Sequence, residues 1–171
     1  LGYTEKHPSV GLFLAQDPKT MKIYVYREYR MAGVGEQYID DISRLCEGED
    51  ISEYYADPSM WAEKKDKYDS ESMANMFIRS GIPIMQAKNA RETGWRNLRQ
   101  WMYYSDSRPN MLYIMDCCPT LIQTIPMMKY SKSIRGHTED LDSTLYDDAV
   151  DALRYGIMSY EYPMIGEIIS D

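Results

Sequence analysis

Three aspartates stand close together in the segment 146–160, whose sequence is YDDAVDALRYGIMSY. At about 100° per residue, the apolar residues of this segment form one face of a helix. The carboxylates of Asp147, Asp148 and Asp151 gather on the opposite side. Like charges three or four positions apart repel each other on a helix. Two interpretations follow: the acids form an ordinary solvated face, or they face a cation.

Asp57 is a second acid at a position suited to ligand binding. It follows a short strand predicted over 53–56, within the sequence YADPSMW at 55–61. Ligands collect at the carboxyl ends of strands in open α/β sheets, which makes Asp57 a candidate ligand. Aspartate followed by proline is also a good helix start, with Asp57 as the N-cap and Pro58 as the first helical residue. The sequence leaves both roles open.

Size and composition point to one intracellular domain without a membrane partner. The chain has 171 residues, of which 44% are hydrophobic, enough to bury a core within a single domain. No apolar run approaches the ~20 residues that cross a bilayer, and residues 1–10 lack the pattern of a signal peptide. The three cysteines have no CxxC spacing, so the sequence suggests neither a disulfide framework nor a zinc site.

Basic residues are concentrated despite a net charge of −8. An acidic average argues against binding to nucleic acid, because phosphates are neutralised by Lys and Arg. Lys129, Lys132 and Arg135, however, lie together in the apparent loop 129–137, where they are available to contact DNA. The alternative is that they form ordinary solvated surface.

Hydrophobic periodicity predicts an alternation of strands and helices. Strand composition at 10–16 and 22–29, with a turn sequence at 17–20, predicts an antiparallel hairpin. The segments 111–116 and 121–130 predict either a second hairpin or one strand and a loop. The other predicted elements are helices at 36–47, 70–81, 91–104 and 146–160, and strands at 53–56 and 82–87. This order predicts an α/β fold in which helices flank a central mixed sheet, the hairpin plus parallel strands.

Several stretches together resemble one family, the C-terminal nuclease domain of the large terminase subunit of tailed double-stranded DNA phages. They occur in the family's order along nearly the whole chain, at 2–15, 23–29, 55–61, 81–98 and 147–155. The resemblance implies a ribonuclease H-like fold. It also implies a metal-dependent endonuclease that cleaves concatemeric double-stranded viral DNA during genome packaging in the host cell cytoplasm.

The family's functional residues can be carried over position by position. Its first strand ends in a catalytic aspartate, and Leu1 and Gly2 match the residues that follow it. We therefore expect residues 1–171 to be a single nuclease domain truncated just after the first catalytic strand. Asp57 matches the second acid of the family, and Asp148 or Asp151 matches the third. Some members have histidine where Asp148 stands, which leaves the division of labour between Asp148 and Asp151 open.

The same resemblance sets expectations for the activity and partners of the chain. Without the aspartate before Leu1, the chain is expected to be inactive or weakly active. The family's partners are double-stranded DNA, an ATPase domain in the same polypeptide, the portal protein and the small terminase subunit. The sequence contains no GxxxxGK[ST] phosphate loop, so the ATPase domain is not encoded in it.

Two-metal chemistry gives a reason for acids that converge from different elements. Mg²⁺ and Mn²⁺ prefer carboxylate oxygens and retained waters. Two such ions about 4 Å apart activate a water and stabilise the leaving oxygen of a phosphodiester. Asp57, Asp148 and Asp151 would hold them, with the upstream aspartate. Asp147 is the weakest candidate, because Thr144 and Asp147 also fit a capping box at the helix start.

Other roles remain open at this stage. Glu28, near the end of the second hairpin strand, is either a carboxylate supporting the metal ligands or a surface residue. The chain could also be another ribonuclease H-like nuclease, such as a resolvase or a transposase core. A third possibility is a non-catalytic module that docks the packaging motor on the portal.

Overall fold

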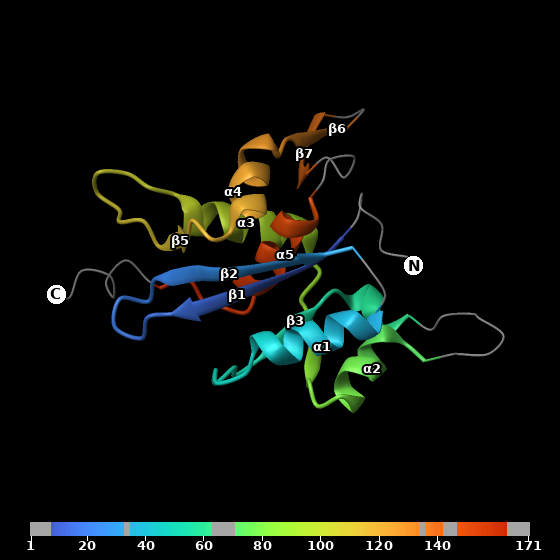
Figure 1. Cartoon of the computed structure of the whole chain (residues 1–171). Helices are drawn as coiled ribbons and strands as arrows, with labels where there is room; N and C mark the ends of the chain where they lie inside the picture. Colours follow the sequence, from blue (N-terminus) through green and yellow to red (C-terminus); the bar gives the residue numbers. More distant parts are fainter. Residues whose placement is uncertain (1–7, 33–34, 63–70, 134–135, 142–146, 164–171) are drawn as a thin grey trace.

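A computed structural model of the chain describes residues 8–32, 35–62, 71–133, 136–141 and 147–163. Within these residues, two long strands, β1 (Ser9–Gln16) and β2 (Ile23–Met31), run through the middle of the molecule (Figure 1). They pair antiparallel, and β2 also pairs in parallel with the short strand β5 (Leu112–Ile114). The order β1–β2–β5 confirms the mixed sheet predicted from the sequence.

The turn between β1 and β2 is built by Asp17. Its carboxylate accepts hydrogen bonds from the backbone N–H of Lys19 (2.9 Å) and the hydroxyl of Thr20 (2.7 Å). Met21 closes the turn with a φ of 57°, in the left-handed region that few residues other than glycine adopt. The predicted hairpin is therefore confirmed, with its turn where the sequence indicated.

A β-bulge at Tyr26 changes which face of the sheet the side chains of β2 occupy. Phe13 of β1 is opposite Arg27, and Leu14 is opposite Val25, so Tyr26 is an extra residue. Before the bulge, Ile23 and Val25 are buried in one hydrophobic core; after it, Tyr29 and Met31 pack against a second core on the other face. One strand thereby serves both cores.

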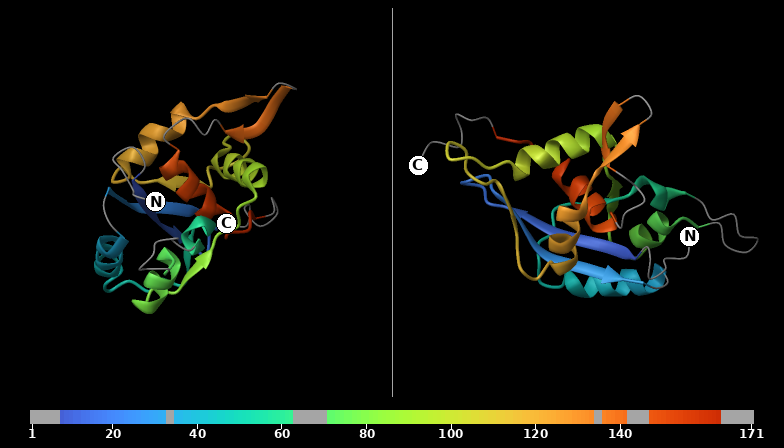
Figure 2. Two further views of the ribbon diagram at one scale, coloured as in Figure 1. Left: turned by 90° about the vertical axis from the view of Figure 1, so that its right-hand side faces the viewer. Right: turned by 90° about the horizontal axis from the view of Figure 1, so that it is seen from above.

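The helices divide between these two faces (Figures 1 and 2). The first core lies between the sheet and three helices: α3 (Arg91–Met102), α4 (Pro119–Thr124) and α5 (Asp148–Ile157). The second core contains side chains from α1 (Gly35–Leu45), α2 (Met73–Arg79) and β4 (Ile84–Gln86). The sheet is thus covered by helices on both faces, as expected for an α/β fold.

Two further strand pairs lie outside the three-stranded sheet. β3 (Tyr54–Ala56) pairs in parallel with β4, as the strand–helix–strand alternation predicted. After β3 comes the 3₁₀ helix η1 (Pro58–Trp61), and another, η2 (Ile125–Met127), follows α4. The last pair is the antiparallel hairpin of β6 (Tyr130–Ser133) and β7 (Gly136–Leu141), which projects from the rest of the molecule (Figure 2).

Two sequence predictions were wrong in this region. Residues 121–130, expected to be either the second strand of a hairpin or a loop, form most of α4 and the whole of η2. Pro119 occupies the first turn of α4, where its missing N–H costs nothing, and an acid from another element supplies the cap described below. The expected loop 129–137 is largely the β6–β7 hairpin, in which Lys132 is opposite His137. Gly136 and the polar residues after it have no strand signal of their own.

No helix in the described part of the chain is both long enough and apolar enough to span a bilayer.

Candidate active site

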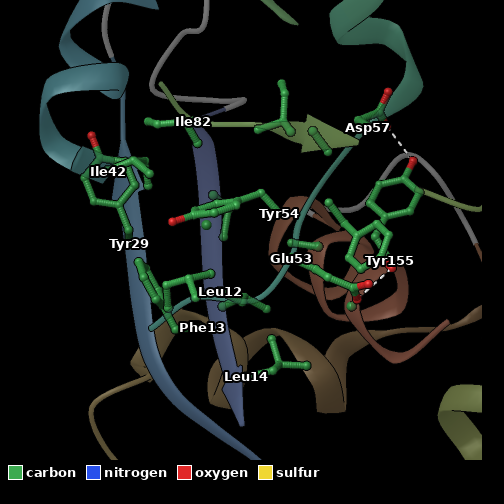
Figure 3. A pocket seen from close by; sticks show the side chains of 18 of the residues that line it. Leu12, Phe13, Leu14, Tyr29, Ile42, Glu53, Tyr54, Asp57, Ile82 and Tyr155 are labelled. Atoms are coloured by element: carbon green, nitrogen blue, oxygen red, sulfur yellow. Dashed lines mark hydrogen bonds between the residues drawn. The ribbon is translucent and has the colours of Figure 1, made fainter. Parts of the chain in front are cut away.

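A cavity of about 810 Å³ lies between β1 and β3 (Figure 3). Its wall includes every residue from Pro8 to Gln16 and from Ile51 to Asp57. Alternate residues of a strand point to opposite faces of a sheet, so an unbroken run of lining residues means that the cavity follows the edge of each strand. In the described structure, β1 is paired only with β2 and β3 only with β4. The cavity is therefore bordered by two unpaired strand edges.

Asp57 lies at the carboxyl end of β3, on the wall of this cavity. Its Oδ1 accepts a hydrogen bond from the backbone N–H of Ser59 at 2.7 Å, which caps η1. Its Oδ2 accepts a hydrogen bond from the hydroxyl of Tyr155 on α5, drawn as a dashed line in Figure 3. The capping role that the sequence suggested is thus present. Asp57 is also bonded to Tyr155 of α5, which lies 98 positions further along the chain.

Asp148 and Asp151 reach the same cavity from the first turn and a half of α5. The packing of α5 against β1 and β3 therefore places the acids at 57, 148 and 151 along the same cavity. Asp147 is not among the residues that line the cavity in the described structure. α5 begins at Asp148, so Asp147 is its N-cap residue rather than the third helical residue, and its side chain makes no capping hydrogen bond. Thr144, the other half of the expected capping box, lies outside the described residues.

Asp151 is held by two arginines. The Nε of Arg154, one turn later on α5, donates a hydrogen bond to its Oδ1 at 3.0 Å. Nη1 of Arg91, at the start of α3, lies 3.5 Å from its Oδ2. Arg91 also approaches Asp147, with 4.0 Å between Nη2 and Oδ2. The repulsion between the acids of this helix is offset by cations within the protein, so the acids do not form a simple solvated face.

Burial and hydrogen bonding shift the pKa of Asp57 in opposite directions but shift the pKa of Tyr155 in the same direction. Burial raises the pKa of Asp57, but the hydrogen bonds from Ser59 and Tyr155 outweigh it, and the pKa is lowered overall. Burial and the charge of Asp151 raise the pKa of Asp147. Burial, and then the bond to Asp57, raise the pKa of the Tyr155 hydroxyl to about 12. Asp57 is thus a carboxylate and Tyr155 a protonated donor at neutral pH.

Carboxylates are the type of ligand that a hard divalent cation prefers, but those of the described residues do not form a complete metal site. Carboxylate oxygens are the ligands that Mg²⁺ and Mn²⁺ prefer. Among the described residues, no three His, Cys, Asp or Glu side chains are grouped closely enough to hold a metal ion. Asp57 and Asp148 would hold a cation only with a further carboxylate, and Asp151 only in competition with Arg154 and Arg91.

Glu28 has a structural partner away from the cavity. Its Oε1 accepts a hydrogen bond from the backbone N–H of Thr120 (3.1 Å) and its Oε2 from that of Leu121 (2.8 Å). These are orphan N–H groups in the first turn of α4. Glu28 therefore caps α4 and does not line the cavity that contains Asp57.

The three basic residues expected to contact DNA are at or near the β6–β7 hairpin. Lys129 is exposed immediately before β6, and Lys132 is within it. Arg135 lies outside the described residues. Lys129 is not among the described residues that line the cavity between β1 and β3.

Tyr155 and Arg154 are site residues that the sequence did not reveal. Both belong to the same predicted helix as the acids, in the sequence DALRYG at 151–156. Helical spacing gives one signal: Arg154 stands three positions after Asp151, as ion-paired residues often do. No comparable signal connects Tyr155 with Asp57, because that contact depends on how α5 packs beside β3.

Comparison with known proteins shows similarity of structure but not of sequence. No protein-family model and no curated protein sequence matches the chain. The large terminase of a thermophilic bacteriophage is similar in structure, with a TM-score of 0.71 and 17% identity; the match covers 91% of this chain and 37% of that chain. This chain thus spans a little over a third of the length of that protein.

Two isolated nuclease domains are similar along most of their own length. That of the bacteriophage P22 large terminase has a TM-score of 0.65 and 17% identity, covering 92% of this chain and 77% of that chain. That of the bacteriophage SPP1 large terminase, solved with bound Mn, has a TM-score of 0.62 and 16% identity, covering 91% and 78%. The fold of this chain is therefore that of the ribonuclease H-like nuclease domains of phage large terminases.

Proposed function

We propose that this protein is the nuclease part of a phage DNA-packaging enzyme, a metal-dependent endonuclease that cuts concatemeric double-stranded DNA into packaged units in the host cell cytoplasm. The observation that carries the proposal is that Asp57, Asp148 and Asp151 line the same cavity, from a strand end and a helix start. The structural similarity to terminase nuclease domains supports it.

In this proposal the three acids share the binding of divalent cations. Asp57 and Asp148 hold a divalent cation, Mg²⁺ or Mn²⁺, and Asp151 shares that task when it is released from its arginines. Two such ions would supply an activated water and neutralise the leaving oxygen of the phosphodiester. Lys129, Lys132 and Arg135 contact DNA phosphates, which fixes the position of the duplex without reading its sequence.

The proposal includes a further strand that carries another aspartate. We expect this strand to precede Leu1, to end in aspartate, and to lie in the cavity between the unpaired edges of β1 and β3. Neighbouring strands are separated by about 4.8 Å, and a strand in this position would pair with both edges. Its aspartate would supply the missing ligand beside Asp57. An ATPase domain further upstream, the portal protein and the small terminase subunit are the partners of the whole protein in this scheme.

A second candidate, a module that docks the motor on the portal without cutting DNA, is favoured by one observation. Both oxygens of Asp151 face arginines, with Arg154 at 3.0 Å and Arg91 at 3.5 Å. An Asp151 carboxylate held in this way would not be available to bind a metal ion. A docking module would retain portal binding and lack metal-dependent nicking.

Nicking of supercoiled plasmid in Mn²⁺ separates these functions. The protein should be assayed with an apolar strand ending in aspartate restored before Leu1, beside its Asp57→Asn and Asp148→Asn variants. We expect metal-dependent nicking that falls by orders of magnitude in both variants, with Asp106→Asn, on an exposed turn, as a matched control that stays fully active. Equal nicking by all four proteins, or none by the unsubstituted one, would refute the nuclease proposal.

A further inference from the structure

Two adjacent residues of α5, Tyr155 and Arg154, each form a hydrogen bond with a different acid of the candidate site. The hydroxyl of Tyr155 donates a hydrogen bond to Oδ2 of Asp57, and Nε of Arg154 donates one to Oδ1 of Asp151 at 3.0 Å. Both residues also reach Oδ1 of Asn89, which lies 3.3 Å from the Tyr155 hydroxyl and 3.4 Å from Nη2 of Arg154. Tyr155 has one proton to donate, and a charged carboxylate is the stronger acceptor. The bond to Asp57 is therefore the preferred one.

The contacts to Asp57 fix its carboxylate without using all of its lone pairs. Oδ1 has one donor in Ser59 and Oδ2 has one in Tyr155. Each oxygen of an ionised carboxylate has two lone pairs. A lone pair on Oδ2 therefore remains for a cation, while donors from two different elements, η1 and α5, oppose rotation about χ1.

The Tyr155 ring is in turn held by Arg154. The guanidinium carbon of Arg154 lies 4.2 Å from the centre of the Tyr155 ring and 5.1 Å from that of Trp95. Arg154 is 0% exposed, and its Nη1 is buried without a hydrogen-bond partner among the described residues. Burying a charged donor that is not fully bonded costs stability. An apolar side chain in this space would cost less in free energy of folding. The presence of Arg154 is therefore not explained by its contribution to the stability of the fold.

We propose that Tyr155 is a positioning residue for Asp57, supported by the ring contact with Arg154, and that it sets the direction of the Asp57 carboxylate before a cation arrives. The consequence for metal binding rests on the proposed nuclease function. The orientation of Asp57 belongs to the metal-free protein and can be measured without any activity. Tyr155 does not itself contact the cation in this scheme.

Tyr155→Phe removes only the hydroxyl, and Tyr160→Phe is the matched control, since Tyr160 also lines the cavity. The first measurement is the three-bond coupling of the Asp57 Cγ in the metal-free full chain, which reports averaging between χ1 rotamers. The second is the Mn²⁺ dissociation constant by calorimetry, measured on the protein with a strand ending in aspartate added before Leu1, and the third is the thermal midpoint. We expect rotamer averaging at Asp57 in Tyr155→Phe alone, a dissociation constant raised about tenfold, and a thermal midpoint lowered only modestly, through the loss of one hydrogen bond.

A single rotamer retained at Asp57 in Tyr155→Phe would overturn the proposal, whatever the Mn²⁺ result. Averaging that appears equally in Tyr160→Phe would also overturn it, because the effect would then not depend on the hydroxyl at Asp57. If averaging is specific to Tyr155→Phe and the unsubstituted protein with the added strand binds no Mn²⁺, the positioning contact stands and the proposed metal site is refuted.

Discussion

The backbone of Gly94 in α3 lies directly against the side chain of Arg154 in α5. A β-carbon built at Gly94 would be 2.7 Å from Cγ and 2.8 Å from Cδ of Arg154, and 2.8 Å from Sδ of Met158. Arg154 is fully buried and bonded to Asp151, so it has little room to move. The absence of a side chain at Gly94 is what allows the arginine to pass between the two helices.

Gly94→Ala should therefore destabilise the protein, although alanine favours helix by up to ~1 kcal/mol. Crowding of a packed core costs about 1–3 kcal/mol, and we expect a net loss of about 1–2 kcal/mol in urea unfolding. The double-mutant cycle with Arg154→Ala identifies the cause, because the shortened side chain relieves the crowding. Equal effects of Gly94→Ala in both backgrounds would contradict this account.

Asp151→Asn should lower stability. Repulsion from neighbouring acids alone predicts a small gain of roughly 0.2–0.5 kcal/mol. The ion pair reverses this expectation, because the substitution leaves Arg154 buried beside a neutral amide. Since the amide oxygen still accepts a hydrogen bond, we expect a loss of about 1–3 kcal/mol. Asp106→Asn, on an exposed turn, is the control for urea unfolding, and a stabilised Asp151→Asn would show that repulsion between the acids dominates.

Glu28→Ala should destabilise the protein without affecting the metal site. It removes the acceptor for two N–H groups in the first turn of α4, and loss of a helix cap typically costs about 1 kcal/mol. Thermal unfolding measures this loss, and calorimetry with Mn²⁺ should give the same dissociation constant as the unsubstituted protein. A weakened Mn²⁺ affinity at unchanged stability would instead indicate that Glu28 supports the metal ligands.

The pair formed by Tyr26 and Glu49 should make stability depend on acid pH. The Tyr26 hydroxyl donates a hydrogen bond to Oε2 of Glu49 at 2.6 Å, and Arg27 lies 2.5 Å from Oε1. The bond from Tyr26, and with it Arg27, lowers the pKa of Glu49 below its ordinary value of 4.5. A carboxyl with a lower pKa in the folded state stabilises it above the ordinary pKa and loses this contribution as pH falls through the folded-state value.

Tyr26→Phe and Glu49→Gln should thus be less stable than the unsubstituted protein at pH 7. The difference should shrink as the pH falls below the ordinary pKa of 4.5 for Glu49. Urea unfolding at a series of pH values measures it, with Tyr113→Phe as the control on the neighbouring strand β5. A difference that stays constant from pH 7 to well below that value would show that Glu49 contributes through packing rather than through charge.

Replacement of Lys129, Lys132 and Arg135 by alanine should weaken the salt dependence of DNA binding. Each phosphate contact contributes about −0.9 to the slope of log K against log salt concentration, so we expect the slope to become shallower by up to ~3. The control is the triple replacement of Lys19, Arg44 and Arg79, which lie in the β1–β2 turn, α1 and α2. Fluorescence anisotropy with a duplex measures both. An unchanged slope would make the residues at 129–135 ordinary solvated surface.

Local sequence signals were sufficient for most elements and for the positions of the acids at a strand end and a helix start, while the role of these acids as metal ligands stays a prediction. The apolar face and the charged face of 146–160 predicted α5, and Asp57 stands at the strand end where it was expected. α4 was missed because its start depends on Glu28, which is 92 positions from Thr120. The contact between Tyr155 and Asp57 was missed for the same reason: tertiary packing, not spacing along the chain, creates it.

The extra residue at Tyr26 places a constraint on the length of β2. Deleting Tyr26 would restore a regular ladder and move the residues on one side of it to opposite faces of the sheet. Glu28 would then leave the face that carries α4, and Tyr29 would leave the core that contains α1 and α2. A single insertion or deletion near Tyr26 would therefore disrupt the contacts of β2 with the helices on both faces of the sheet. Evolution can tolerate such a change only when a second one nearby restores the alternation of side chains.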